Sequence, residues 1–247
     1  MIFEIRKSYQ KIQKKTSKEN IKNKFKKMLK KLLYLALFPL FGLQNLAYAQ
    51  ADFEGIVHYR VSIEALDDKV KEYDLMQFYG DKARFSFKKG NYRWDFEQST
   101  IESQTYNHKE NKLYDKYAKN DTLYWTNATD EVEDILQETP IKTDTQVKIL
   151  GKPCQLLTVN TKFIKTGEKR GRMYFFATGY KVNPALLSKH RFNNMNYIYD
   201  KMKAIPLQII VLHKSYRILY EAFNIDFKPL KDEVFSIPKK AKIKKMK

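Results

Sequence analysis

Residues 82–98 read KARFSFKKGNYRWDFEQ, and this short stretch indicates the type of fold. Apolar and polar side chains alternate in 82–88 and again in 92–98, which is the period of a half-buried β-strand. Gly90-Asn91 stands between the two runs, and both residue types accept the positive φ that a two-residue hairpin requires. The stretch therefore predicts an antiparallel hairpin with one aromatic face.

The same pattern of strand and turn continues along the chain. Further strands are predicted at 54–63, 72–79, 103–108, 112–118, 122–126, 146–150, 153–160, 170–177, 207–214, 216–227 and 233–237. Short turn signals join most of them, so neighbouring strands are expected to pair as an antiparallel meander. The 17 Tyr, 16 Phe and 2 Trp of the chain suit this interpretation, because aromatic side chains pack well on sheets.

One segment, 183–203, has a helical pattern instead. Asn183 can cap a helix, Pro184 fits its first position, and Pro206 ends it. Apolar residues between them recur at roughly helical spacing. The sequence predicts one main helix lying on a large antiparallel sheet, either as a core-facing element or as a mobile lid over a cavity.

Residues 28–49, MLKKLLYLALFPLFGLQNLAYA, have the pattern of a secretory signal peptide. Two lysines precede the apolar run 32–43, and Ala47-Tyr48-Ala49 fits the site that signal peptidase cleaves. A membrane-spanning helix is the alternative, but it needs about 20 apolar residues. Gln50 follows the cleavage site where a lipoprotein has cysteine. We expect an exported protein, in the periplasm or associated with the envelope, soluble after cleavage at Ala49.

The lysine-rich residues 1–27 precede this signal. Either translation begins at Met28, which is the favoured interpretation, or the stretch is a long cytoplasmic extension. The predicted organisation is therefore a basic extension plus signal peptide at 1–49, one β-rich domain at 50–238 and a basic disordered tail at 239–247.

The formal net charge of +19 is concentrated at the ends of the chain. Residues 1–49 carry 12 basic and 2 acidic residues, and 239–247 carry 6 lysines and no acid. The body keeps 29 basic and 26 acidic residues, a nearly balanced surface. Nucleic acid is therefore not an expected partner. The tail is either a solvated terminus or a weak contact to a membrane surface.

No catalytic motif, metal-ligand pattern or cofactor-binding loop stands out in the sequence. We therefore expect no catalytic residues, no bound metal, no cofactor and no enzyme activity. The four histidines lack metal-ligand spacing. Cys154 is the one cysteine and is expected to be buried, and the acidic run 130–134 is expected to be solvated.

The candidate binding surface is a set of aromatic side chains, which we call the aromatic wall. Alternation puts its members on one face of three nearby strands, where they would either form ordinary core or line an apolar cavity. The wall consists of Phe85, Phe87, Tyr92, Trp94, Phe96 and Trp125.

Several short motifs resemble uncharacterised exported bacterial proteins related to the LolA/LolB-like half-barrel. They are ADFEGIVHY at 51–59, VKILGKPC at 147–154, AIPL at 204–207 and DEVFSIP at 232–238. The resemblance spans 53–238 and implies a mainly β (α+β) fold, in which one strongly curved antiparallel sheet, a half-barrel, packs one main helix on its concave side. In characterised relatives that side holds lipid.

Two functions follow as expectations. The first is an exported periplasmic protein that binds a lipid or another apolar small molecule in a half-barrel. The alternative is a structural or protein-interaction protein of the envelope, with a fully packed core and no ligand. A continuous apolar pocket would favour the first.

Overall fold

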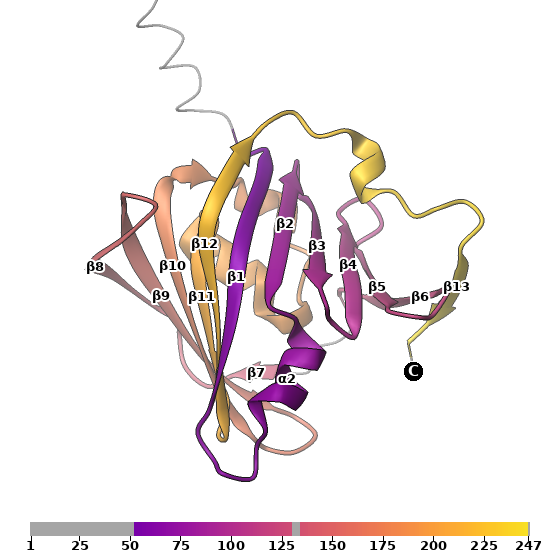
Figure 1. The fold of residues 1–247 in the computed structure, drawn as a ribbon. Helices are drawn as coiled ribbons and strands as arrows, with labels where there is room; N and C mark the ends of the chain where they lie inside the picture. The colour runs from indigo at the N-terminus through magenta and orange to yellow at the C-terminus, as the bar shows by residue number, and fades with distance from the viewer. Residues whose placement is uncertain (1–51, 130–133, 247) are drawn as a thin grey trace, which may run out of the picture. The chain divides into compact units, whose positions relative to one another are not determined.

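The computed structural model describes residues 52–129 and 134–246. The predicted signal peptide, its cleavage after Ala49, the start at Met28 and most of the acidic run 130–134 lie outside this part of the chain. The described chain is mainly β and forms one thirteen-stranded, mostly antiparallel sheet (Figure 1). This confirms the prediction of a mainly β protein built on a large antiparallel sheet.

The elements follow one another as the alternating pattern predicts, with a few exceptions. The strands are β1 (Gly55–Ala65), β2 (Lys82–Lys88), β3 (Asn91–Glu97), β4 (Ile101–Asn107), β5 (Lys112–Tyr117), β6 (Thr122–Asn127), β7 (Asp134–Leu136), β8 (Ile141–Ile149), β9 (Lys152–Phe163), β10 (Lys169–Lys181), β11 (Ala204–Leu212), β12 (Tyr216–Phe227) and β13 (Lys242–Lys245). The helical elements are α2 (Glu72–Tyr79), the 3₁₀ turns η1 (Pro184–Leu187) and η2 (Phe192–Asn194), α3 (Met195–Met202) and the 3₁₀ turn η3 (Asp232–Phe235).

Two meanders meet in the middle of the sheet. Strands β1 to β6 pair in chain order, and so do β9 to β12. The antiparallel pairing of β1 with β12 joins the two meanders into one sheet. At one end β13 runs parallel to β6, and at the other β7 and β8 pair with successive parts of β9, so the sheet is open.

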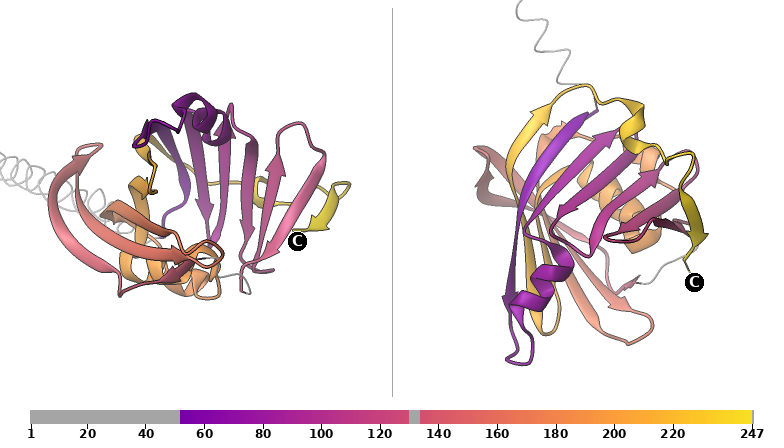
Figure 2. Two further views of the ribbon diagram at one scale, coloured as in Figure 1. Left: turned by 90° about the horizontal axis from the view of Figure 1, so that it is seen from below. Right: turned by 45° about the vertical axis from the view of Figure 1, so that its right-hand side comes forward.

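One face of the sheet carries most of the buried side chains, and we call it the core face. Its members alternate with more exposed residues along each strand, as the pleat requires. On this face lie Val57, Tyr59, Phe85, Phe87, Tyr92, Tyr106, Leu113, Leu157, Val159, Tyr174 and Ala222. The segment with η1, η2 and α3 packs against this face, as Figure 2 shows, and buries Leu187, Ile198, Tyr199 and Met202.

The predicted single helix over 183–203 is wrong in its continuity. Asn183 does act as a cap, because its side-chain oxygen accepts a hydrogen bond from the backbone N–H of Ala185, next to Pro184. The helix then breaks, because Asn193 and Asn194 take left-handed backbone angles, with φ of 53° and 60°. Asparagine tolerates this conformation better than most residues. The segment is therefore two 3₁₀ turns followed by the eight-residue helix α3.

The predicted strand at 72–79 is helix α2 instead. The stretch EYDLMQFY contains no β-branched residue and begins with two acids, Glu72 and Asp74, which favour a helix N-terminus. Gly80 follows with φ of 76° and closes the last turn through a hydrogen bond from its N–H to the Met76 carbonyl. Gly80-Asp81 therefore ends a helix rather than forming the predicted hairpin turn.

Two predictions near the C-terminus also differ from the structure. The predicted strand at 233–237 is the 3₁₀ turn η3. The predicted disordered tail contains strand β13, which pairs with the otherwise unpaired edge of β6, and the N–H of Met246 bonds to the Trp125 carbonyl. An unpaired strand edge offers backbone donors and acceptors, and this short lysine-rich segment satisfies them.

Candidate functional site

Five of the six residues of the predicted aromatic wall share the core face. Phe85, Phe87 and Tyr92 are buried, whereas Trp94 and Phe96 are half-buried. Trp125 lies on the opposite face, because β6 pairs with β5 in a register that puts Trp125 beside Tyr114. The structure therefore brings together five wall residues and excludes the sixth.

In the buried part of the wall, Tyr92 packs against His190. Its imidazole Nε2 is 2.7 Å from the Tyr92 hydroxyl, and its ring is stacked on Tyr106 with centroids 4.1 Å apart. The side chain is fully buried, and this burial lowers the pKa of His190 to about 3, so the ring is neutral at physiological pH. This part of the core face is packed core.

A short polar network fixes the covering segment in place. The hydroxyl of Tyr106 donates to Asn111 Oδ1 at 2.8 Å. The amide of Asn111 in turn donates to the Lys189 carbonyl at 3.2 Å and to the Thr129 hydroxyl. Asn111 occupies the β4–β5 turn with φ of 52°, so this turn holds the chain immediately before His190.

The end of the core face near α2 is different, because its aromatic side chains are only half-buried. Trp94 stacks on Phe96, with centroids 5.9 Å apart and planes at 10°, and meets Tyr220 at 6.0 Å. The Tyr79 hydroxyl, from α2, is 3.2 Å from that of Tyr216. We call these five residues, Tyr79, Trp94, Phe96, Tyr216 and Tyr220, the aromatic cluster.

Sequence reasoning missed three members of the aromatic cluster. The alternating pattern predicts a strand at 72–79, whereas Tyr79 lies at the end of helix α2. Tyr216 and Tyr220 share one face of β12 with Ile218 and Ala222, and this face joins the core. Their period of two is visible in the sequence. Their position beside Trp94 depends on the pairing of β1 with β12, which no local pattern shows.

Basic side chains from β10 lie on the same face as Tyr174, to one side of the aromatic cluster. The Arg170 guanidinium is 4.4 Å from the centre of the Phe163 ring, and the Arg172 guanidinium donates to the Asn193 carbonyl at 3.2 Å. His213 stacks on Tyr216 at 4.2 Å. Burial, and then the Arg170 charge, lower the pKa of His213.

A buried carboxyl lies on the other side of the cluster. Trp94, Gln104 and Asp115 are in register across β3, β4 and β5, and the Gln104 amide donates to Asp115 Oδ1 at 2.9 Å. Burial raises the pKa of Asp115 to about 6, which the Gln104 hydrogen bond opposes. Gln104 thus separates Trp94 of the aromatic cluster from this weakly acidic carboxyl.

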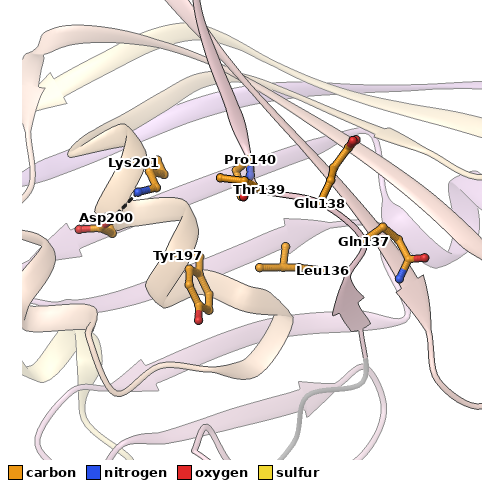
Figure 3. Close-up of a pocket in the computed structure, with 8 residues that line it drawn as sticks. All are labelled: Leu136, Gln137, Glu138, Thr139, Pro140, Tyr197, Asp200 and Lys201. Carbon is orange, nitrogen blue, oxygen red and sulfur yellow. Dashed lines mark ion pairs between the residues drawn. The ribbon is translucent and has the colours of Figure 1, made fainter.

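Four hollows lie on the surface of the described chain, and three of them border the segment that covers the core face. One of about 350 Å³ lies between α3 and residues 136–140, and Figure 3 shows Leu136 and Tyr197 on facing sides of it. A second of about 400 Å³ shares these two residues, and two others measure about 440 and 600 Å³. Polar and apolar side chains both line them, and the hollow of about 440 Å³ is the most polar of the four. None of these four hollows is lined by the aromatic wall.

The described residues contain no group of three or more His, Cys, Asp or Glu side chains placed to hold a metal ion. Cys154 is buried and unpaired, and burial raises its pKa. Within the same part of the chain, no helix is both long and apolar enough to cross a membrane. The sequence matches no protein-family model, and no curated protein is similar to it. The resemblance to the LolA/LolB-like half-barrel therefore stays a prediction.

Proposed function

We propose that this chain is an exported envelope protein that holds a lipid or another apolar small molecule on the concave side of a half-barrel. The observation that carries the proposal is the aromatic cluster, whose five large side chains stay half-buried at one end of the core face. Aromatic surface kept partly open, with a few polar groups beside it, is typical of small-molecule sites. Gln104, the cross-strand neighbour of Trp94, and His213, which stacks on Tyr216, are such groups.

The distance between Trp94 and Tyr220 supports a concave core face. Their strands, β3 and β12, are separated by β2 and β1 in the sheet. Adjacent strands lie about 4.8 Å apart, so β3 and β12 would be about 14 Å apart in a flat sheet. Ring centroids only 6.0 Å apart favour a sheet that curves toward this face, with α3 on the concave side.

Export rests on the predicted signal peptide alone. The body of the chain is nearly neutral and its single cysteine is buried, so the fold does not depend on a disulfide. N-terminal sequencing of the protein purified from its own host tests this point. A mature terminus at Gln50 supports export, and an intact terminus at Met1 or Met28 contradicts it.

The two tryptophans give a matched pair of variants for the ligand. The protein is purified as its host processes it and titrated with the apolar fluorescent probe N-phenylnaphthylamine. We expect Trp94→Leu to weaken probe binding about tenfold, because about 1.4 kcal/mol of stacking and burial is lost. Trp125→Leu, on the opposite face, should leave binding unchanged. Native mass spectrometry of the unaltered protein then identifies any lipid that co-purifies.

A second candidate is a structural or protein-interaction role with no ligand. It is favoured by Phe85, Phe87 and Tyr92, which are buried in the core, with Tyr92 packed against His190. A ligand-free mass, together with equal probe binding by Trp94→Leu and Trp125→Leu, would support this candidate and reject the first.

A further inference from the structure

The β13 end of the sheet carries a compact surface, which we call the basic edge and which includes both faces of the edge strand β13. Its members come from β5, β6 and the C-terminal strand β13. They are Lys112, Trp125, Lys242, Ile243, Lys244 and Lys245.

The parallel register of β13 and β6 determines which side chains share a face. Ile243 pairs with Leu123 and Lys245 with Trp125, so Ile243 and Lys245 extend the face on which Trp125 lies. Lys242 and Lys244 alternate to the other side of the same edge strand. All four residues of β13 are exposed, and Ile243 exposes 48% of its surface.

Two lysines border the indole of Trp125. The ammonium of Lys112 is 4.6 Å from the ring centre and that of Lys245 is 5.5 Å from it. Lys112 also lies 3.8 Å from Glu110, whereas Lys245 forms no ion pair within the described chain. Trp125 is half-buried and Ile243 is exposed, so both side chains are accessible at least in part.

The charge around this surface is one-sided. Residues 239–246 contain five lysines and no acid. None of these five makes an ion pair with another residue in the described ranges 52–129 and 134–246. Their charges are therefore available to a partner that is negative over an extended area.

The chemistry of the basic edge favours one such partner, a lipid surface with anionic head groups. Lysines and a tryptophan around an exposed aliphatic side chain suit the boundary between head groups and acyl chains. A second protein strand is disfavoured, because lysines on an exposed edge oppose strand addition. We propose that the basic edge docks the protein on an anionic membrane surface, a role independent of any ligand on the core face.

The test measures co-sedimentation of the host-processed protein with phosphatidylcholine vesicles, with and without phosphatidylglycerol. We expect binding only to the anionic vesicles, weakening as salt is added. Lys242→Gln, Lys244→Gln and Lys245→Gln together should weaken it roughly 100-fold, since a lysine near the surface contributes about fivefold. The matched triple variant Lys69→Gln, Lys148→Gln and Lys152→Gln removes equal charge elsewhere and should bind far more strongly than the first.

A second measurement reports on Trp125 itself without perturbing the lysines. Anionic vesicles should shift its emission to shorter wavelength, a shift that Trp125→Phe abolishes and Ile243→Ser reduces. Absence of binding to anionic vesicles overturns the proposal, and so does an equal loss in the two triple variants. Binding of a DNA duplex as tightly as vesicles, with no effect of Ile243→Ser, would also overturn it in favour of a general polyanion site.

Discussion

The rings of Trp94 and Tyr220 are 6.0 Å apart, although their strands are separated in the sheet by both β2 and β1. Between them on the core face stand Ala83, which is small, and Tyr59, whose ring lies 5.4 Å from the indole. The small side chain on β2 leaves room for the two larger rings to approach each other. One contact thus links the first meander to the second beyond the hydrogen-bonded pairing of β1 with β12.

This contact predicts an energetic coupling between Trp94 and Tyr220. In a double-mutant cycle with Trp94→Leu and Tyr220→Leu, we expect a coupling free energy of about 1 kcal/mol, the usual value for an edge-to-face aromatic pair. Urea unfolding of the four proteins measures it. A second cycle, Trp94→Leu with Trp125→Leu, joins opposite faces and should be additive within about 0.5 kcal/mol. Equal coupling in both cycles would contradict a specific contact.

The extent to which the sequence predicted this structure depends on whether the determining signal is local. Residues 82–98 form β2 and β3 almost as predicted, because alternation and a glycine-containing turn are encoded within the stretch itself. α2 was missed because eight residues fit either period, and the helix stop at Gly80 has the same composition as a hairpin turn.

The position of Trp125 shows how register limits prediction of the site. Alternation divides the side chains of each strand between two faces, but it does not show which face joins the core. The row that begins at Trp94 continues through Gln104 and Asp115 to Tyr124, so the neighbouring residue, Trp125, points the other way. A one-residue difference in register exchanges the two faces, and only the full set of pairings settles it.

Asp115 gives a prediction about stability above neutral pH. Its pKa is raised to about 6 in the folded protein, against about 3.9 in an unfolded chain. The folded state therefore holds the proton more tightly, and this carboxyl contributes stability below pH 4 that is lost as pH rises through 6. Asp115→Asn keeps the acceptor for Gln104 and should raise the free energy of unfolding at pH 8 by about 2 kcal/mol.

Urea unfolding of the Asp115→Asn variant and the unaltered protein at pH 8 and at pH 4 measures this difference. The stabilisation should be present at pH 8 and small at pH 4, where the carboxyl is protonated in the folded state and about half protonated in the unfolded chain. Asp95→Asn is a suitable control, because its carboxylate is ion-paired with Arg93 and should not be stabilised by neutralisation. A stabilisation that is independent of pH would show that packing, not ionisation, is responsible.

The lowered pKa of His190 predicts that the free energy of unfolding decreases in acid, the opposite of the effect of Asp115. Its pKa is lowered to about 3 in the folded state, against about 6.5 in the unfolded chain. The unfolded state takes up the proton first, so stability is full above pH 6.5 and falls toward pH 3. At pH 5 the loss from this residue should be about 2 kcal/mol.

His190→Phe removes this proton while keeping a ring beside Tyr106. Combined with Tyr92→Phe, which avoids an unpaired hydroxyl, it should flatten the decline in free energy of unfolding between pH 7 and pH 5 by about that amount. Chemical denaturation at several pH values measures the slope. An unchanged slope in the double variant would refute the assignment.

The backbone conformation of Gly80, at the end of α2, predicts how substitution of this glycine affects stability. Its φ of 76° is strained for other residues, and a Cβ there would collide with the Glu97 carbonyl oxygen. Gly80→Ala should therefore destabilise the protein by about 2 kcal/mol or more.

Gly151 has a similar φ of 71° but open surroundings, so Gly151→Ala should destabilise the protein by about 1 kcal/mol. Gly179→Ala has neither constraint and should change stability by less than about 0.5 kcal/mol. Thermal or urea unfolding of the three variants ranks them, and a Gly80→Ala variant no less stable than Gly151→Ala would mean that α2 does not close against Glu97 in solution.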